Sequence, residues 1–245
     1  ACVIGCAVQT GVGAVLNTAR VEEGATVLVL GLGGIGLSIV QGARLAGAAR
    51  IIAGDPVAAR REVAVRLGAT DPFDPTRDDP AATAVALTGI GVDYAFDAVG
   101  RASLIQACVA ATRAGGTTVC VGAAPIDEAV TIAPAALFTL TEKKVLGCAL
   151  GSCNSRRDIP RLLHLHQAGR LDLGALIGMA LEAARRDIER IAAAAPKPPA
   201  LPAAAQVAAD AYDYVMERLR AYYLERPAGD GLAVTTEMFD AVLAR

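Results

Sequence analysis

A glycine-rich turn between a predicted strand and a predicted helix constrains the fold of this chain more than any other feature. Residues Thr26 to Leu30 form a short apolar run rich in β-branched side chains, typical of a buried parallel strand. It is followed by four glycines, Gly31, Gly33, Gly34 and Gly36, and then by a segment with helical periodicity. Gly31 allows a tight turn, Gly33 lets the backbone approach a pyrophosphate, and Gly36 lets the helix pack close to the sheet. This order predicts a dinucleotide-binding unit.

A carboxylate completes the pattern at the end of the next predicted strand. Residues Arg50 to Ala53 form a second apolar run, and Asp55 follows it, about twenty residues after the last glycine of the turn. A carboxylate at this place accepts hydrogen bonds from the adenosine ribose hydroxyls and repels a 2′-phosphate. The sequence therefore predicts NAD rather than NADP as the cofactor. The alternative is a purely structural glycine turn, which the register of Asp55 disfavours.

Predicted strands and helices continue to alternate along the chain. We expect helices over 57–67, 80–87 and 102–113, strands over 69–73, 92–96 and 117–121, and a turn at Gly115 and Gly116. This alternation predicts an α/β fold with a doubly wound parallel sheet of the Rossmann type. Ligands of such sheets lie at the carboxyl ends of the strands, so 97–101 and 122–125 are expected to line the cofactor cleft.

Composition excludes several other classes. The chain has 245 residues, of which 54% are hydrophobic and 20% charged, with a formal net charge of −2. A disordered chain and a general binder of nucleic-acid backbones are both disfavoured. There is no apolar run long enough to span a membrane and no basic leader segment, although the absence of an initial Met suggests a start within a longer protein. The six cysteines form no CxxC pair, which favours a reducing, cytoplasmic setting.

Several segments resemble the zinc-dependent medium-chain alcohol dehydrogenases. They are IGCAVQTGVGAV, GLGGIG, VDYAFDAVGR, GGTTVCVGAAP and EKKVLGCALGS, between Ala1 and about Leu173, and the first two look closest to the glutathione- or mycothiol-linked formaldehyde dehydrogenase branch. The resemblance implies hydride transfer to NAD from a small alcohol or a hydroxymethyl thiol adduct, with zinc polarising the alkoxide. It also implies a possible homodimer, because family members associate through a strand region near Thr131 to Phe138.

The same resemblance assigns individual site residues. Cys6 matches the third ligand of the catalytic zinc, Asp55 the ribose-binding acid, and Arg60 a basic neighbour of the ribose. The cofactor-binding positions implied in this way are Thr10, Gly31, Leu32, Gly33, Gly34, Ile35, Gly36, Asp55, Arg60, Val99, Arg101, Val121, Ala123, Cys148 and Leu150.

The expected zinc site is incomplete. A catalytic zinc takes three protein ligands and keeps an open position. The family's other ligands belong to a GroES-like domain that precedes this region, so we expect Cys6 to behave as a small thiol and the chain alone to be inactive. His164 and His166 are two residues apart on a predicted helix and therefore point to different faces, which favours surface positions over a metal role.

A change of character marks the C-terminal part. Residues 192–205 are rich in alanine and proline, and two amphipathic helices are expected after them. YDYVMERLRAYYLE with TTEMFDAVLA resembles the C-terminal helical region of the bacterial glycyl-tRNA synthetase β subunit. It implies tRNA contacts through Arg and Tyr side chains; plain helix packing is the alternative. We therefore divide the chain into an NAD-binding domain (1–175), a helical stretch and linker (176–202) and a helical tail (203–245), with a seam between about 169 and 195. A further alternative is a non-functional fusion that neither binds NAD nor contacts tRNA.

Overall fold

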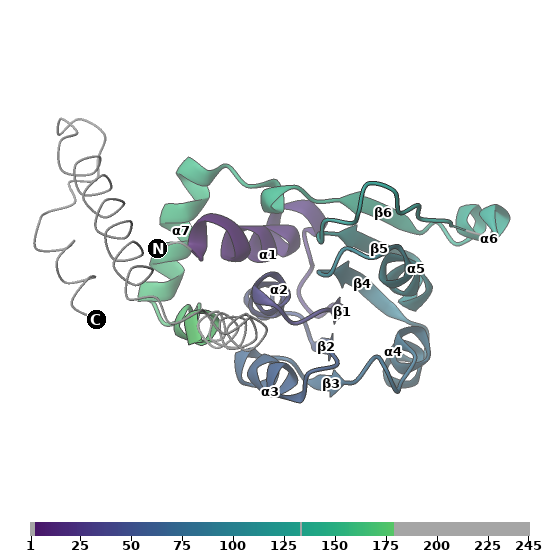
Figure 1. Ribbon diagram of the computed structural model, residues 1–245, viewed down its shortest axis with the longest axis horizontal. Coiled ribbons are helices and arrows are strands. Elements are labelled where there is room, and N and C mark those ends of the chain that lie inside the picture. Colours follow the sequence, from purple (N-terminus) through teal and green to yellow (C-terminus); the bar gives the residue numbers. More distant parts are fainter. Residues whose placement is uncertain (1–2, 133, 179–245) are drawn as a thin grey trace, which may run out of the picture. The chain divides into compact units, whose positions relative to one another are not determined.

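The computed structural model describes residues 3–132 and 134–178, which all belong to one compact unit, Ala1–Arg186. Its centre is a six-stranded parallel sheet with the strand order β3-β2-β1-β4-β5-β6 (Figure 1). The strands are β1 (Thr26–Leu30), β2 (Arg50–Gly54), β3 (Asp71–Phe73), β4 (Val92–Asp97), β5 (Thr112–Cys120) and β6 (Lys144–Gly147). The order reverses beside β1, which makes the sheet doubly wound.

Helices cover both faces of this sheet. They are η1 (Ile4–Val8), α1 (Gln9–Gly13), η2 (Ala14–Ala19), α2 (Gly34–Leu45), α3 (Ala58–Leu67), α4 (Pro80–Thr88), α5 (Ala102–Ala111), α6 (Ala135–Leu140), η3 (Leu150–Ser152) and α7 (Ser155–Gln167). None of the helices in these ranges is long and apolar enough to cross a membrane.

The core has two layers because side chains alternate along β1. Val27 and Val29 point to the face covered by the N-terminal helices, α2, α3 and α7. Leu28 and Leu30 point to the opposite face, where they pack with buried residues of α4 and α5. All four side chains are buried, as expected for a strand at the centre of a parallel sheet.

The predicted alternation of strands and helices is confirmed, but the boundary between α5 and β5 differs from the prediction. Gly115 and Gly116 lie within β5 rather than in a turn before it, and the strand begins at Thr112. The pairing of β4 with β5 shifts register between Val92 and Tyr94, and Gly115 adopts φ +73°. The glycines thus allow an irregularity inside a strand, which a sequence pattern does not distinguish from a turn.

The prediction of a strand near Thr131 to Phe138 is wrong. This segment leads into α6, which begins directly after Pro134. Proline is compatible with a helix start, and the helix sequence AALFTL contains good helix formers. The predicted helices and linker of 179–245, including the segment compared with the glycyl-tRNA synthetase β subunit, lie outside the described residues.

Candidate nucleotide-binding site

The glycine turn after β1 is shaped by two close backbone approaches. Gly31 has φ +89° and donates its N–H to the Gly54 carbonyl at 2.8 Å. A Cβ at Gly36 would collide with the Gly31 carbonyl, so only glycine fits at that place. Gly33, in contrast, has open space where its Cβ would lie. The turn is therefore closed toward the sheet and open on its outer side, where a ligand could approach the protein backbone.

The start of α2 offers unpaired donors beside this open side. Its first internal hydrogen bond runs from the Leu37 N–H to the Gly33 carbonyl at 2.9 Å. Within the described residues, the N–H groups of Gly34, Ile35 and Gly36 have no acceptor. Free N–H groups and the positive end of the helix dipole favour an anion such as a phosphate.

Asp55 is joined to the glycine turn by a direct hydrogen bond. Its side chain is only 2% exposed, and Oδ2 accepts the Leu32 N–H at 2.8 Å. Oδ1 accepts the Val57 N–H at 2.8 Å, and Arg60 Nη1 lies 3.4 Å from Oδ2. Leu32, Asp55 and Arg60, which the sequence assigned to one site, thus lie together.

Arg61 is a neighbour that sequence reasoning missed. Its Nη1 donates to the backbone carbonyl of Asp55 at 2.6 Å and lies 3.4 Å from the Asp74 carboxylate. The signal in the sequence was its place beside Arg60 at the start of α3. Two guanidinium groups therefore flank the end of β2, each held by an acid.

The loop after β4 packs over the glycine turn. The Ala98 N–H donates to the Leu30 carbonyl at 2.9 Å, and a Cβ at Gly31 would collide with the Val99 side chain. Val99 is 46% exposed, so half of it faces outward beside the turn. At the other side of the loop, Gly100 touches the backbone of Ala123, which follows Val121 at the end of β5.

Arg101 is engaged by an acid that the sequence did not single out. Its Nη1 lies 2.6 Å from Glu128, whose other oxygen accepts the Ala102 N–H at 2.7 Å. The Ala102 N–H and the Arg101 guanidinium together lower the pKa of Glu128. The guanidinium of Arg101 is thus directed at Glu128 at the start of α5.

The remaining predicted positions lie where α1 meets η3. Thr10 is buried in α1, and the neighbouring Gly11 packs against the backbone of Ile35 at the start of α2. Cys148 Sγ accepts the Thr18 hydroxyl at 3.3 Å. Leu150 has φ +47° and a 54% exposed side chain.

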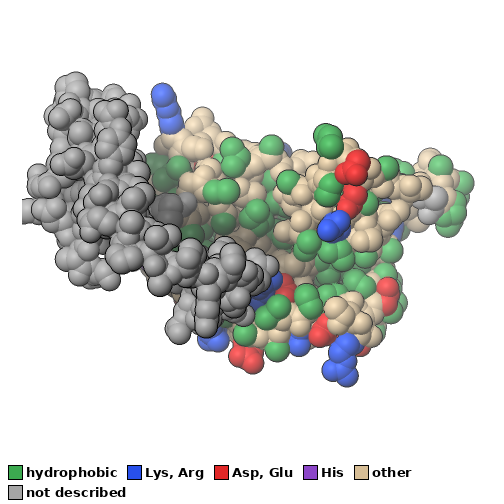
Figure 2. Space-filling model, in the orientation of Figure 1, with side chains coloured by type: hydrophobic (Ala, Val, Ile, Leu, Met, Phe, Trp, Pro, Cys, Tyr) green, Lys and Arg blue, Asp and Glu red, His purple; other side chains and the backbone are tan. Residues whose placement is uncertain are grey.

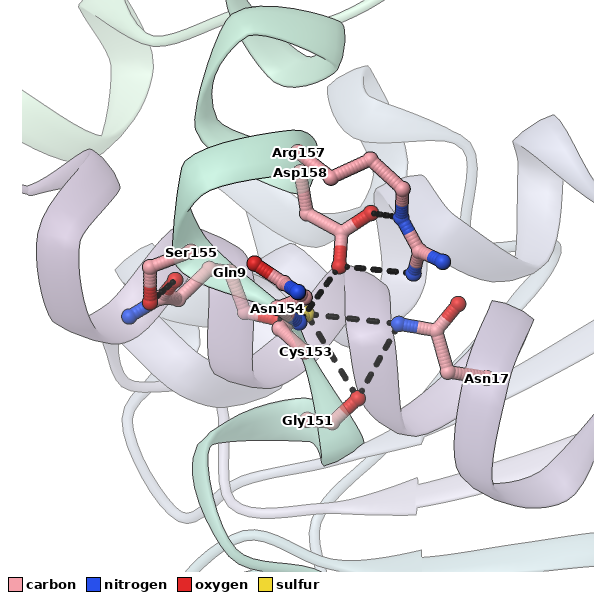
Figure 3. A network of polar contacts seen from close by, with 8 residues as sticks. All are labelled: Gln9, Asn17, Gly151, Cys153, Asn154, Ser155, Arg157 and Asp158. Carbon is pink, nitrogen blue, oxygen red and sulfur yellow. Dashed lines mark hydrogen bonds and ion pairs between the residues drawn. The ribbon is translucent and has the colours of Figure 1, made fainter.

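A polar network fastens η3 and α7 to the N-terminal helices (Figure 3). Asn17 Nδ2 donates to the Gly151 carbonyl at 3.2 Å and to Cys153 Sγ at 3.3 Å. The Ser155 hydroxyl donates to Gln9 Oε1 at 3.0 Å. Burial raises the pKa of the Cys153 thiol, with the nearby Asp158 as a second cause. Cys153 is therefore a protonated structural thiol at neutral pH.

The residues present do not form a complete zinc site. Cys6 is exposed in η1, and the described ranges contain no group of three His, Cys, Asp or Glu side chains that could hold a metal ion. His166 lies on α7, and its Nδ1 is 2.9 Å from the carbonyl oxygen of Leu171, beyond the end of that helix. The described residues thus do not by themselves bring together the three ligands that a catalytic zinc takes.

Comparisons with known proteins agree with this arrangement. S-(hydroxymethyl)glutathione dehydrogenase from Synechocystis sp. is 38% identical over 184 residues, which are 74% of this chain and 49% of the relative. Alcohol dehydrogenase class-3 from Cereibacter sphaeroides is 38% identical over 72% of this chain and 49% of its own length. The chain thus spans about half the length of the curated relatives it matches.

Solved structures give the same result. Benzyl alcohol dehydrogenase from Acinetobacter calcoaceticus superposes with a TM-score of 0.70 and 31% identity, over 75% of this chain and 52% of that one. A putative zinc-binding dehydrogenase from Sinorhizobium meliloti 1021, bound to NADP, has a TM-score of 0.61 and 29% identity, over 69% and 49%. The family described as zinc-binding dehydrogenase matches residues 34–168, more than half of the sequence. The chain therefore belongs to the zinc-binding dehydrogenase family.

Proposed function

We propose that this chain binds NAD(H) and forms the cofactor-binding part of an oxidoreductase that transfers hydride from an alcohol carbon. One observation carries the proposal: the Asp55 carboxylate is bonded to the Leu32 N–H within the glycine turn. This bond joins the acid proposed to bind the ribose to the turn proposed to bind the pyrophosphate, at the carboxyl ends of β1 and β2.

Different residues of the site are suited to different parts of the cofactor. The free N–H groups of Gly34, Ile35 and Gly36 are suited to the pyrophosphate, and the open side of Gly33 lets it approach the backbone. Asp55 accepts one backbone N–H on each oxygen and a longer bond from Arg60 on Oδ2, which leaves a lone pair on Oδ1 for a ribose hydroxyl. Val99, Val121 and Ala123 border the same edge of the sheet and are proposed to line the cleft with Thr10, Cys148 and Leu150. NAD, when bound, supplies the hydride acceptor.

Asp55 is proposed to select NAD over NADP, because its carboxylate would repel a 2′-phosphate. The Sinorhizobium meliloti protein is bound to NADP, so membership of the family does not decide the preference. Thermal unfolding of this chain with each dinucleotide tests the proposal. We expect NAD to raise the Tm by several degrees and NADP to raise it much less.

A variant of Asp55 tests whether this residue causes the preference for NAD over NADP. Asp55→Ala is expected to lose the preference for NAD and to respond more to NADP, because Arg60 and Arg61 remain beside the ribose position. Asp71→Ala is a matched control, since it removes an acid paired with Arg50 on the adjacent strand. Unchanged discrimination in Asp55→Ala, or no response of the parent chain to NAD, would overturn the proposal.

The substrate is proposed from the relatives. S-(hydroxymethyl)glutathione dehydrogenases and an alcohol dehydrogenase of class 3 are among the most similar curated proteins, so we propose an alcohol or a hydroxymethyl thiol adduct. Zinc chemistry would need ligands beyond Cys6, so we expect no turnover from the described residues alone. Accordingly, a chelator should leave NAD binding unchanged; a loss of NAD binding would contradict this expectation.

A homodimer is proposed at the β6 edge of the sheet. Among the residues that the structure describes, β6 is an edge strand with one unpaired side, and Leu137 and Leu140 of the neighbouring α6 are 56% and 78% exposed. Figure 2 shows hydrophobic side chains at this end of the molecule. Light scattering after gel filtration tests the dimer: Leu140→Glu should yield a monomer, whereas Val85→Glu on α4 should not.

The role of the C-terminal part and the domain boundary near residue 175 also stay proposals. Limited proteolysis around 196–202 tests the division of the chain, since linkers are cut before folded domains. A gel shift with tRNA tests the suggested contacts of 203–245, and absence of binding at moderate salt would reject them.

A further inference from the structure

Asp97, the last residue of β4, belongs to the segment expected to line the cofactor cleft, but its carboxylate is buried. Its side chain is 0% exposed, and within 3–132 and 134–178 no lysine or arginine pairs with it. A buried charge destabilises a fold unless hydrogen bonds compensate for it. Here the compensation comes from the backbone of the next residues: Asp97 accepts the Val99 N–H at 3.1 Å and the Gly100 N–H at 3.2 and 3.0 Å.

These bonds hold the backbone of 98–100 in one conformation. Gly100 has φ +82°, and a Cβ there would collide with the backbone of Ala123. On the opposite side, the Val99 side chain fills the space where a Cβ of Gly31 would lie. The loop is thus clamped between the glycine turn and the end of β5, with the Asp97 carboxylate at its centre.

The backbone of Asp97 reinforces the clamp. Its carbonyl accepts the N–H groups of Val121 at 2.9 Å and Gly122 at 3.0 Å. One residue therefore fixes both loops that follow β4 and β5. Burial raises the pKa of Asp97 above its ordinary value, and the N–H groups of Val99 and Gly100 only partly oppose this shift. Burial and the Asp97 charge also raise the pKa of the nearby thiols Cys108 and Cys120.

We propose that Asp97 is a positioning residue for the dinucleotide: its carboxylate holds Val99 over Gly31 and thereby sets the width of the slot beside the glycine turn. This inference rests on the proposed function, because it is the NAD slot whose width is set. Asp97 does not touch the cofactor in this scheme. It acts through Val99, whose side chain packs against Gly31 and is 46% exposed.

Aspartate suits this place better than its amide. Gly100 N–H lies within 3.2 Å of both carboxylate oxygens, and Val99 N–H uses one of them as well. Asparagine offers one acceptor oxygen and turns an NH₂ donor toward these N–H groups. Asp97→Asn should therefore weaken the clamp, and Asp97→Ala should remove it.

Asp93 provides a matched control on the same strand. It lies at the opposite end of β4 and accepts the Thr26 N–H at 2.8 Å and Arg113 Nε at 2.6 Å. Asp93→Asn therefore makes the same chemical change and loses comparable bonds, far from the glycine turn. Any general loss of stability should appear in both variants, whereas loss of NAD affinity should appear only at Asp97.

The experiment has two readouts on the full chain. Amide hydrogen exchange of Val99 and Gly100, without ligand, measures how firmly the loop is held. Calorimetric titration with NAD, well below the Tm of each variant, measures the Kd of the cofactor. We expect faster exchange at both amides and a Kd about tenfold weaker in Asp97→Asn, with a larger loss in Asp97→Ala. Asp93→Asn should keep the parent Kd. If Asp97→Ala does not fold, Asp97→Ser takes its place, because a serine hydroxyl can still accept one nearby N–H.

The outcomes separate this inference from the proposed function. If the parent binds NAD and Asp97→Asn binds it equally well, the positioning role is overturned and the proposed function stands. If the parent does not bind NAD, the proposed function and the dinucleotide role fail together, while the exchange data still show whether Asp97 clamps the loop. Unchanged exchange at Val99 and Gly100 overturns the clamp itself.

Discussion

On the β1–β2 side of the sheet, the site is assembled from residues that lie close together along the chain. On the β5–β6 side, where η3 and α7 meet the N-terminal helices, the contacts join segments that are far apart in sequence. The bond from Leu32 to Asp55 spans 23 residues, and that from Asn17 to Cys153 spans 136. The first arrangement follows from one strand–turn–helix–strand unit. The second exists only after the whole sheet has formed. Substitutions on the two sides should therefore have different consequences for binding and for stability.

The largest effect is expected at Gly36, on the β1–β2 side. An alanine there would collide with the Gly31 carbonyl, which cannot move without opening the turn. Gly36→Ala should lower the free energy of unfolding by roughly 3 kcal/mol and abolish NAD binding. Urea denaturation and an NAD titration measure both. Gly33→Ala is the contrast, since its Cβ meets nothing within 4 Å: stability should hold while NAD binding weakens.

A smaller effect on stability is expected at Gly13, on the other side. A Cβ there would lie 2.5 Å from Cys153 Sγ and 2.9 Å from the Gly151 Cα, so Gly13→Ala should push η3 away from α1. We expect the free energy of unfolding to fall by about 2 kcal/mol, with a modest change in NAD affinity. Gly5→Ala, in the same helical run but with open space, serves as the control. A loss of NAD binding as complete as in Gly36→Ala would erase the distinction between the two sides.

The smallest effect concerns the pH dependence that Asp158 brings to the β5–β6 side. Hydrogen bonds from Arg157 hold the pKa of Asp158 below its ordinary value. A carboxyl whose pKa is lower in the folded state stabilises the protein at any pH above its unfolded pKa, which is about 4. This contribution is lost as the pH falls through the folded pKa. Arg157 is 66% exposed, so the contribution should be at most about 1 kcal/mol.

Denaturation of Asp158→Asn between neutral pH and about pH 3 measures that contribution. The variant should be less stable than the parent at pH 7, and the difference should shrink as the solution becomes acidic. A difference that stays constant with pH would show that Asp158 acts through hydrogen-bond geometry rather than through its charge.

The two sides also differ in how far the sequence predicts them. The glycine turn, β1, β2 and Asp55 were predicted because each signal is local and has a steric or electrostatic cause. The partners of Asp97, Glu128 and Asp158 were not predicted, because they are determined by the packing of the chain, which spacing does not reveal. The strand predicted near Thr131 to Phe138 rests on resemblance to the family, whereas the local sequence, with Pro134 followed by AALFTL, favours the helix α6.

The contacts that join the N-terminal helices to η3 and α7 have a consequence for the order of folding. Cys153 and Gln9 are 144 residues apart, so their contact closes a loop that contains every strand of the sheet. Long-range closures gain little until the intervening chain is ordered, which places them late on the folding path. Substitutions in this network should then mainly accelerate unfolding and leave the refolding rate almost unchanged. The N-terminal helices would thus act as the last fastener of the domain, and their release as the first step of its unfolding.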